Sequence, residues 1–196
     1  MPAEAAVAMW WDIPAEVQAE WEDWHTHEHM SERLSIPGFL RGSRWVSGSS
    51  YFVLYEAATL ATLTVGPYLE RLNNPTPWSR KMMPHHRNMV RSLCSIRARF
   101  GRGIGHALST LRLDAPLDGL AALPERRGLS AALLLQSTPM AGMPQTTEQK
   151  IRGGDAQANW IALIGGYDAD AVDAAARAIA PSAVRGLYRL SYLLTS

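Results

Sequence analysis

Residues Trp21 to Phe39 read WEDWHTHEHMSERLSIPGF, a segment that predicts one helix, a stop and the beginning of a strand. The helix should end near Ser35, because the Pro37-Gly38 pair does not continue a helix. The apolar run that begins at Phe39 then predicts a strand. This helix therefore sets the positions from which the neighbouring elements can be placed.

The elements around this helix predict the order strand, helix, strand, strand, helix, strand. Strands are expected at residues 5–13, 39–46, 51–57 and 90–100, and a second helix at residues 60–72. The passage NNPTPWSRKMMPHH, residues 73–86, has too many prolines to form one regular element.

The same order recurs after the glycine-rich segment GRGIG, residues 101–105, which is read as a linker. It does not follow a strand and open a helix as a dinucleotide-binding loop does. Strands are expected at 106–113, 129–138, 160–167 and 184–195, and helices at 117–126 and 168–180. We therefore predict an α+β protein with two tandem ferredoxin-like (βαββαβ) halves, residues 1–101 and 102–196.

Composition excludes several classes of function. The formal net charge of +1 gives no electrostatic footprint for nucleic acid or an anionic membrane, and the cluster Arg97, Arg99 and Arg102 is too short to change this. No apolar run reaches the roughly 18 residues that a membrane-spanning helix needs. The one cysteine, Cys94, is expected to be a buried free thiol. We expect a cytoplasmic protein.

Ionisable side chains gather at the end of the first predicted helix. A period of 3.6 residues places Trp24, Glu28 and Glu32 on one face, with His25 and His29 at its edge. Such groups are costly inside a protein unless they meet partners, water, a metal or a ligand. This helix end is therefore the best candidate site in the chain.

Three segments together resemble a known family. They are HMSERLSIPGFLR (residues 29–41), YFVLYE (51–56), and Tyr68 with NPTPW (74–78), and they resemble the dimeric α/β-barrel superfamily, most closely its EthD-like branch. The resemblance covers about residues 10–100. It implies an intrachain barrel built from both halves, with a pocket between sheet and helices in the first half and the second half completing the barrel.

The superfamily includes cofactor-free monooxygenases, polyketide cyclases, lactone isomerases, decarboxylases and some haem proteins, so the resemblance alone does not decide the reaction. His29 matches the position of the family's histidine, which implies an acid or base; a structural histidine is the alternative. His25 and Glu28 would support it as further catalytic residues, and solvent exposure is the alternative for His25. For the neighbouring Glu32, an ion pair with Arg33, Arg41 or Arg44 is the favoured interpretation. Tyr55 could donate a hydrogen bond to a developing enolate or phenolate oxygen.

Aromatic and histidine side chains around this helix predict a flat, apolar substrate. The candidate substrate-binding residues are Trp24, Tyr51, Tyr68, Trp78, His85 and His86. For each ring alone, core packing is the competing interpretation, and for the paired histidines it is exposure in a loop.

Three functions remain open. The first is a cofactor-independent lyase, isomerase or cyclase that acts on an aromatic or polyketide-like molecule. The second is a metal-dependent enzyme, since HTHEH matches the H-x-x-E-H pattern and His25, Glu28 and His29 could bind a divalent metal. The third is a non-catalytic small-molecule-binding protein. Haem is not predicted, because no histidine is singled out as an axial ligand.

The partner expected in each case is a small molecule. The internal duplication would allow the chain to act as a monomer, and a homodimer is left open.

Overall fold

The described strands close into one antiparallel barrel with the order β1-β3-β2-β8-β5-β7-β6-β4. The computed structural model describes residues 2–64, 66–139 and 144–196. The strands are β1 (Ala5–Asp12), β2 (Phe39–Ser47), β3 (Ser50–Ala57), β4 (Arg87–Gly101), β5 (Ala107–Leu113), β6 (Leu129–Ser137), β7 (Trp160–Gly166) and β8 (Val184–Thr195). Strands β1–β4 form one contiguous side of the barrel and β5–β8 the other, joined by the β2–β8 and β4–β6 pairings. This order is compatible with two fused ferredoxin-like halves.

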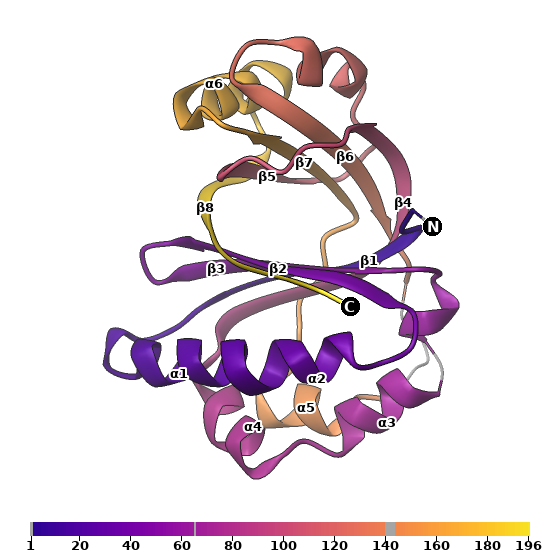
Figure 1. Cartoon of the computed structure of the whole chain (residues 1–196), viewed down its shortest axis with the longest axis vertical. Coiled ribbons are helices and arrows are strands. Elements are labelled where there is room, and N and C mark those ends of the chain that lie inside the picture. The colour runs from indigo at the N-terminus through magenta and orange to yellow at the C-terminus, as the bar shows by residue number, and fades with distance from the viewer. Residues whose placement is uncertain (1, 65, 140–143) are drawn as a thin grey trace.

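Helices cover the barrel on two opposite sides (Figure 1). The α-helices are α1 (Gln18–Trp24), α2 (Met30–Leu34), α3 (Pro67–Asn73), α4 (Pro77–Met82), α5 (Thr147–Ile151) and α6 (Ala169–Ile179). A π-helical turn (His25–His29) joins α1 to α2, and short 3-10 turns lie at Ala15–Val17, Ala61–Leu63, Met83–His85 and Leu120–Glu125. Figure 1 shows α1 to α5 beneath the β1–β3 sheet and α6 at the far end of the molecule.

Alternation along each strand sorts its side chains between two cores, because successive residues point to opposite sheet faces. On β3, Tyr51, Val53 and Tyr55 pack with the helices. Phe52 and Leu54 instead point into the barrel. The molecule therefore has a first-layer core between β1–β4 and α1–α5, a barrel core, and a second-layer core between β5–β8 and α6.

The element order predicted from the sequence is confirmed, with local differences. The helix expected at residues 60–72 is divided, because Gly66 adopts φ +57°, which interrupts a right-handed helix. The Pro-rich passage contains α4, which begins at Pro77 after a Thr76 side chain that accepts a hydrogen bond from the Ser79 amide. The helix expected at residues 117–126 is a 3-10 turn, and α5 is a helix that was not predicted from the sequence.

Cys94 is buried and free as expected, and burial raises the pKa of its thiol to about 12. Among the described residues, no helix combines the length and apolar character needed to cross a bilayer.

Candidate functional site

The helix that carries HTHEH is not a uniform α-helix, because residues 25–29 form a π turn. A π turn uses i→i+5 hydrogen bonds and is wider than an α turn. The buried face therefore moves one residue along the chain, from the expected Glu28 and Glu32 to His29 and Arg33. The predicted register of the ionisable groups is wrong by one position beyond His25. Glu28 and Glu32 remain partly exposed.

His25 and His29 lie among aromatic rings, with exposed fractions of 1% and 8%. His25 stacks on Trp21, with ring centroids 4.7 Å apart and an interplanar angle of 24°. His29 packs against Trp24 at 4.6 Å, and the two imidazole centroids are 5.4 Å apart. His27 is exposed on the opposite side of the helix. We call the set Trp11, Trp21, Trp24, His25, His29 and His86 the His–Trp cluster.

The Nδ1 atoms of His25 and His29 are buried, and neither has a hydrogen-bond partner among the described residues. Burial, as the largest cause, lowers the pKa of both imidazoles well below the ordinary value, and the positive charges of Arg44 near His25 and Arg33 near His29 act in the same direction. Both rings are therefore neutral at pH 7, each with one N–H and one lone pair. An unpaired polar atom in a core carries a free-energy cost that a bound ligand could remove.

His86 is the third imidazole of the cluster. Its Nε2 accepts a hydrogen bond from Trp21 Nε1 at 3.3 Å, which assigns the proton to Nδ1, where it is donated to the Met83 carbonyl at 3.0 Å. Burial is the main cause that lowers its pKa to about 3. These two bonds use both ring nitrogens, so His86 is a fixed wall of the cluster. His85 lies outside the cluster and is partly exposed, and Trp78 packs half-buried at the edge of the first-layer core.

The Glu28 carboxylate is bonded by side chains other than the imidazoles. Its Oε1 accepts hydrogen bonds from Thr76 Oγ1 (2.6 Å), Trp24 Nε1 (3.1 Å) and Ser79 Oγ (3.4 Å). It therefore ties the helix to the start of α4. Among the described residues, no three His, Cys, Asp or Glu side chains are arranged to hold a metal ion. His25, Glu28 and His29 thus do not fit the metal site that was the alternative prediction.

Three tyrosines of the first layer differ in what their hydroxyl groups contact. Tyr51 donates to Glu22 Oε1 at 2.6 Å, and Tyr68 accepts from Arg91 at 3.1 Å. The Tyr55 hydroxyl is buried and has no partner among the described residues. Burial raises the pKa of Tyr55, so the group keeps its proton and is free to donate it in a hydrogen bond.

A buried ion pair that was not predicted from the sequence joins α2 to α5. Arg33, 2% exposed, bonds to Glu148 on α5, which is equally buried. Glu148 also lies 3.8 Å from Arg152, whose guanidinium bonds to Asp155 at 2.8 Å. The α5 segment between β6 and β7 is thus joined to the helix that carries His25 and His29. No local sequence pattern indicates a pair separated by 115 residues.

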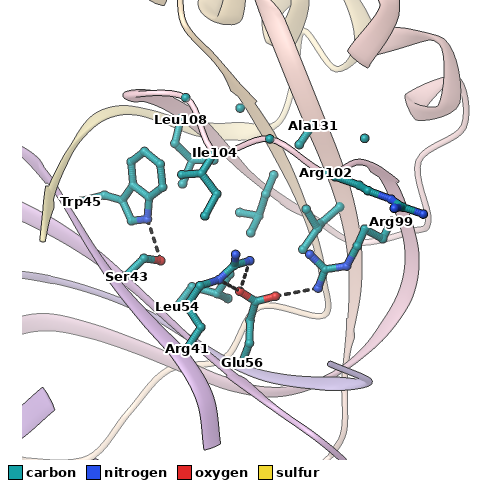
Figure 2. A pocket seen from close by; sticks show the side chains of 16 residues that line it. Arg41, Ser43, Trp45, Leu54, Glu56, Arg99, Arg102, Ile104, Leu108 and Ala131 are labelled. Carbon is teal, nitrogen blue, oxygen red and sulfur yellow. Dashed lines mark hydrogen bonds and ion pairs between the residues drawn. The ribbon is translucent and has the colours of Figure 1, made fainter. Parts of the chain in front are cut away.

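A cavity of ≈ 70 Å³ lies on the other face of the same sheet, inside the barrel (Figure 2). At its mouth the Glu56 carboxylate lies between Arg41 and Arg99, with Arg99 Nη2 2.6 Å from Glu56 Oε1. Its inner wall is mostly apolar and includes Trp45, Leu54, Leu108, Ala131, Leu133, Leu163 and Gly165. Neither His25 nor His29 lines it.

The segment read as a linker forms the rim of this cavity. Arg102, Gly103, Ile104 and Gly105 all line it. Two members of the arginine cluster noted in the sequence, Arg99 and Arg102, line this mouth, but the strand pairing that brings Glu56 and Arg41 beside them cannot be read from local sequence.

The chain matches no protein-family model and no curated protein. Solved structures do share its fold. An anthrone oxidase-like protein superposes with a TM-score of 0.66 at 12% identity, covering 98% of this chain and 93% of that one. A candidate monooxygenase from Lactobacillus acidophilus gives 0.56 at 8% identity over 98% and 96%, and one from Fusobacterium nucleatum gives 0.56 at 7% identity over 100% and 96%.

These likenesses concern the fold, because identities of this size do not carry function. Membership of the EthD-like branch stays a prediction. Over nearly its whole length, the chain has the α+β barrel fold of the anthrone oxidase-like protein and the two candidate monooxygenases.

Proposed function

We propose that this protein is a small-molecule enzyme that moves a proton on an apolar aromatic or polyketide-like substrate, without a cofactor, at His29 and His25. The observation that carries the proposal is the pair of adjacent, neutral, buried imidazoles whose Nδ1 atoms have no partner. Buried polar atoms are normally satisfied, and a catalytic role is one of the explanations for an exception. The substrate would lie between the β1–β4 sheet and the α1–α2 helix, and residues 1–101 would carry the site while 102–196 complete the barrel.

The electrostatic surroundings of His29 disfavour its protonated form, so it would hold an accepted proton only briefly. Burial and, to a smaller extent, the positive charge of Arg33 both oppose a charged His29, so a proton accepted there is readily given back. This behaviour suits an isomerase, cyclase or lyase, in which a base removes a proton and the same group redelivers it. The free Tyr55 hydroxyl would stabilise negative charge on a substrate oxygen in the intermediate.

The substrate class rests on the rings that surround the imidazoles. Trp24 packs against His29, and Trp21 stacks on His25. A flat, apolar molecule would replace ring-to-ring contacts with similar ones and would leave polar recognition to the imidazoles and Tyr55.

Oxygenation is a second candidate, favoured by the names of the structural neighbours, which include an anthrone oxidase-like protein and candidate monooxygenases. Removal of a proton from an activated CH₂ group gives a carbanion that can reduce O₂. The balanced overall change converts CH₂ and O₂ to C=O and H₂O. Dioxygen is then the co-substrate, and the same imidazole acts as the base.

The test compares His29→Gln and His29→Ala with His27→Gln, an exposed histidine on the same helix. Each protein is incubated with a panel of aromatic and polyketide acids, phenols and anthrones, in air and under nitrogen, and products are identified by mass spectrometry. Loss of the His29 side chain should lower kcat by about 10²–10⁴-fold, the usual contribution of acid–base catalysis, and His27→Gln should not.

Product formation in air alone would identify oxygenation, and formation in both atmospheres would identify the lyase, isomerase or cyclase. Saturable binding with no product in either atmosphere would show a binding protein instead. Full activity in the His29 variants would contradict the assignment.

A further inference from the structure

The barrel interior is a site separate from the His–Trp cluster. Along β3, Tyr55 points to the helices, and its neighbours Leu54 and Glu56 line the barrel cavity. The sheet itself therefore separates the two spaces, and a ligand in one does not touch the other.

The cavity opens through a charged mouth into a larger hollow on the barrel's outside. The residues that line both spaces are Arg41, Glu56, Arg99, Gly101 and Arg102. A molecule that enters the barrel here must pass these side chains, while its deeper part meets the apolar wall of Trp45, Leu54, Leu108, Leu133 and Leu163.

The mouth carries more positive than negative charge. Glu56, whose side chain is 4% exposed, is bonded by Arg41 and Arg99, whose side chains are 30% and 29% exposed. Arg102 has no ion-pair partner among the described residues and is exposed. One carboxylate thus faces three guanidinium groups, and Arg99 contributes only its Nη2 to Glu56. Its remaining donors and those of Arg102 are available to an anion.

We propose that the barrel interior binds a small apolar molecule that ends in a carboxylate, with the tail in the barrel and the carboxylate at Arg99 and Arg102. Guanidinium groups bind carboxylates in two-bond, charge-assisted contacts. Ile104, 42% exposed at the rim, would lose apolar surface to water when a tail lies against it. A cationic ligand would be repelled at the mouth, and a neutral one would leave the excess charge unmatched.

The binding test uses hexanoate, with 1-hexanol and hexylamine as ligands of similar length and different charge, measured by isothermal titration calorimetry. Hexanoate should bind about tenfold more tightly than hexanol, as expected for one charge-assisted contact, and hexylamine should not bind. Arg102→Gln should weaken hexanoate by about three- to tenfold. Arg127→Gln, which removes an exposed arginine elsewhere, should leave its Kd unchanged.

A second set of variants fills the cavity. A Cβ at Gly165 would have Leu108 Cδ1 as its nearest neighbour at 3.7 Å, an ordinary contact, so Gly165→Ala fits without a shift and Gly165→Val adds two methyl groups to the lining of the cavity. Leu163→Phe fills the same wall from the neighbouring region of β7. Gly165→Val and Leu163→Phe should both abolish hexanoate binding while leaving the circular dichroism spectrum unchanged.

No hexanoate binding to the native protein, equal affinity for hexanol, or unchanged affinity in a folded cavity-filled variant would each overturn the proposal. His29→Ala should bind hexanoate as the native protein does. Hexanoate binding therefore tests the barrel site, whereas loss of turnover in the His29 variants tests the proposed catalytic function.

Discussion

The two helical layers of the molecule differ in what they bury. The layer over β1–β4 encloses His25, His29 and Arg33, while the second layer over β5–β8 buries apolar side chains together with the neutral hydroxyl of Ser109. Both layers rest on the same kind of antiparallel sheet. Equivalent architecture therefore supports ionisable chemistry on one side and plain packing on the other.

The difference begins with the lengths and side chains of the helices. Helical structure in the first layer runs continuously over residues 18–34, whereas its counterpart after β5 is the 3-10 turn Leu120–Glu125 with Pro124 inside it. The other helix of the second layer, α6, packs through Val172, Ala175 and Ala176. Small side chains let a helix approach the sheet closely, so little space is left for a ligand.

The largest loss of stability is expected when the buried ion pair between Arg33 and Glu148 in the first layer is broken. Glu148→Gln leaves Arg33 buried without its main carboxylate partner, so the free energy of unfolding should fall by about 3–5 kcal/mol. The matched control in the second layer is Arg177→Gln, which cuts an exposed pair with Asp173 and should cost about 0–1 kcal/mol. Urea unfolding followed by circular dichroism measures both. If both variants lost the same free energy of unfolding, the ion pair of the first layer would be no more important for stability than the exposed pair of the second.

A cavity in the second layer should affect stability alone. Leu111→Ala removes a fully buried side chain and should cost about 2–5 kcal/mol. Because that layer carries no proposed chemistry, kcat at a temperature where the variant is folded should be unchanged. A tenfold loss of kcat in the folded variant would contradict the division of roles.

The buried imidazoles should make stability depend on pH. An unfolded histidine binds a proton below about pH 6.5, whereas His25 and His29 with lowered pKa values do not, so protons favour the unfolded chain. Their contribution is present above pH 6.5 and is lost as the pH falls, by up to about 1.4 kcal/mol per pH unit for each histidine. Urea titrations between pH 7 and 5 measure the slope. Replacing His25 and His29 by Gln should reduce it, and replacing the exposed His27 should not.

The smallest change in stability is expected for Tyr55→Phe, a variant in the first layer that should affect kcat and the free energy of unfolding in different ways. Tyr55→Phe removes a buried hydroxyl that has no partner, so stability should change by no more than about 1 kcal/mol and in the favourable direction. Tyr68→Phe removes a partner of buried Arg91 and should destabilise by about 1–2 kcal/mol. If Tyr55 supports catalysis, its variant loses kcat while gaining stability. A stability loss in Tyr55→Phe would point to an unrecognised bond.

Much of the fold could be predicted because its signals are local. Pro37-Gly38, the alternating strands and the acidic start of α6 each act over a few residues, and the elements they predict are present. The α5 helix could not be predicted in the same way, since only five residues form it and its partner Arg33 lies on a distant helix.

The site was predicted in part. The tryptophans and histidines of the first helix do meet, but a uniform period of 3.6 residues could not place them, because the π turn shifts the buried face to His29 and Arg33. His86 joins the cluster from an irregular segment, where periodicity gives no information. The barrel mouth depends on pairings between distant strands, and a sequence pattern of three arginines could not identify its carboxylate partner.

Barrel closure also constrains the order in which the chain can fold. Strands β1–β4 can pair among themselves once residue 101 has been made, but β2 and β4 then present open edges. The β2 edge stays unpaired until β8 is made, when Arg41 pairs opposite Thr195. The β4 edge stays unpaired until β6 is made. Exposed edges invite pairing with other chains, and contacts between distant residues form slowly. During synthesis, the newly made first sheet is therefore the species most exposed to aggregation, until the last strand seals the barrel.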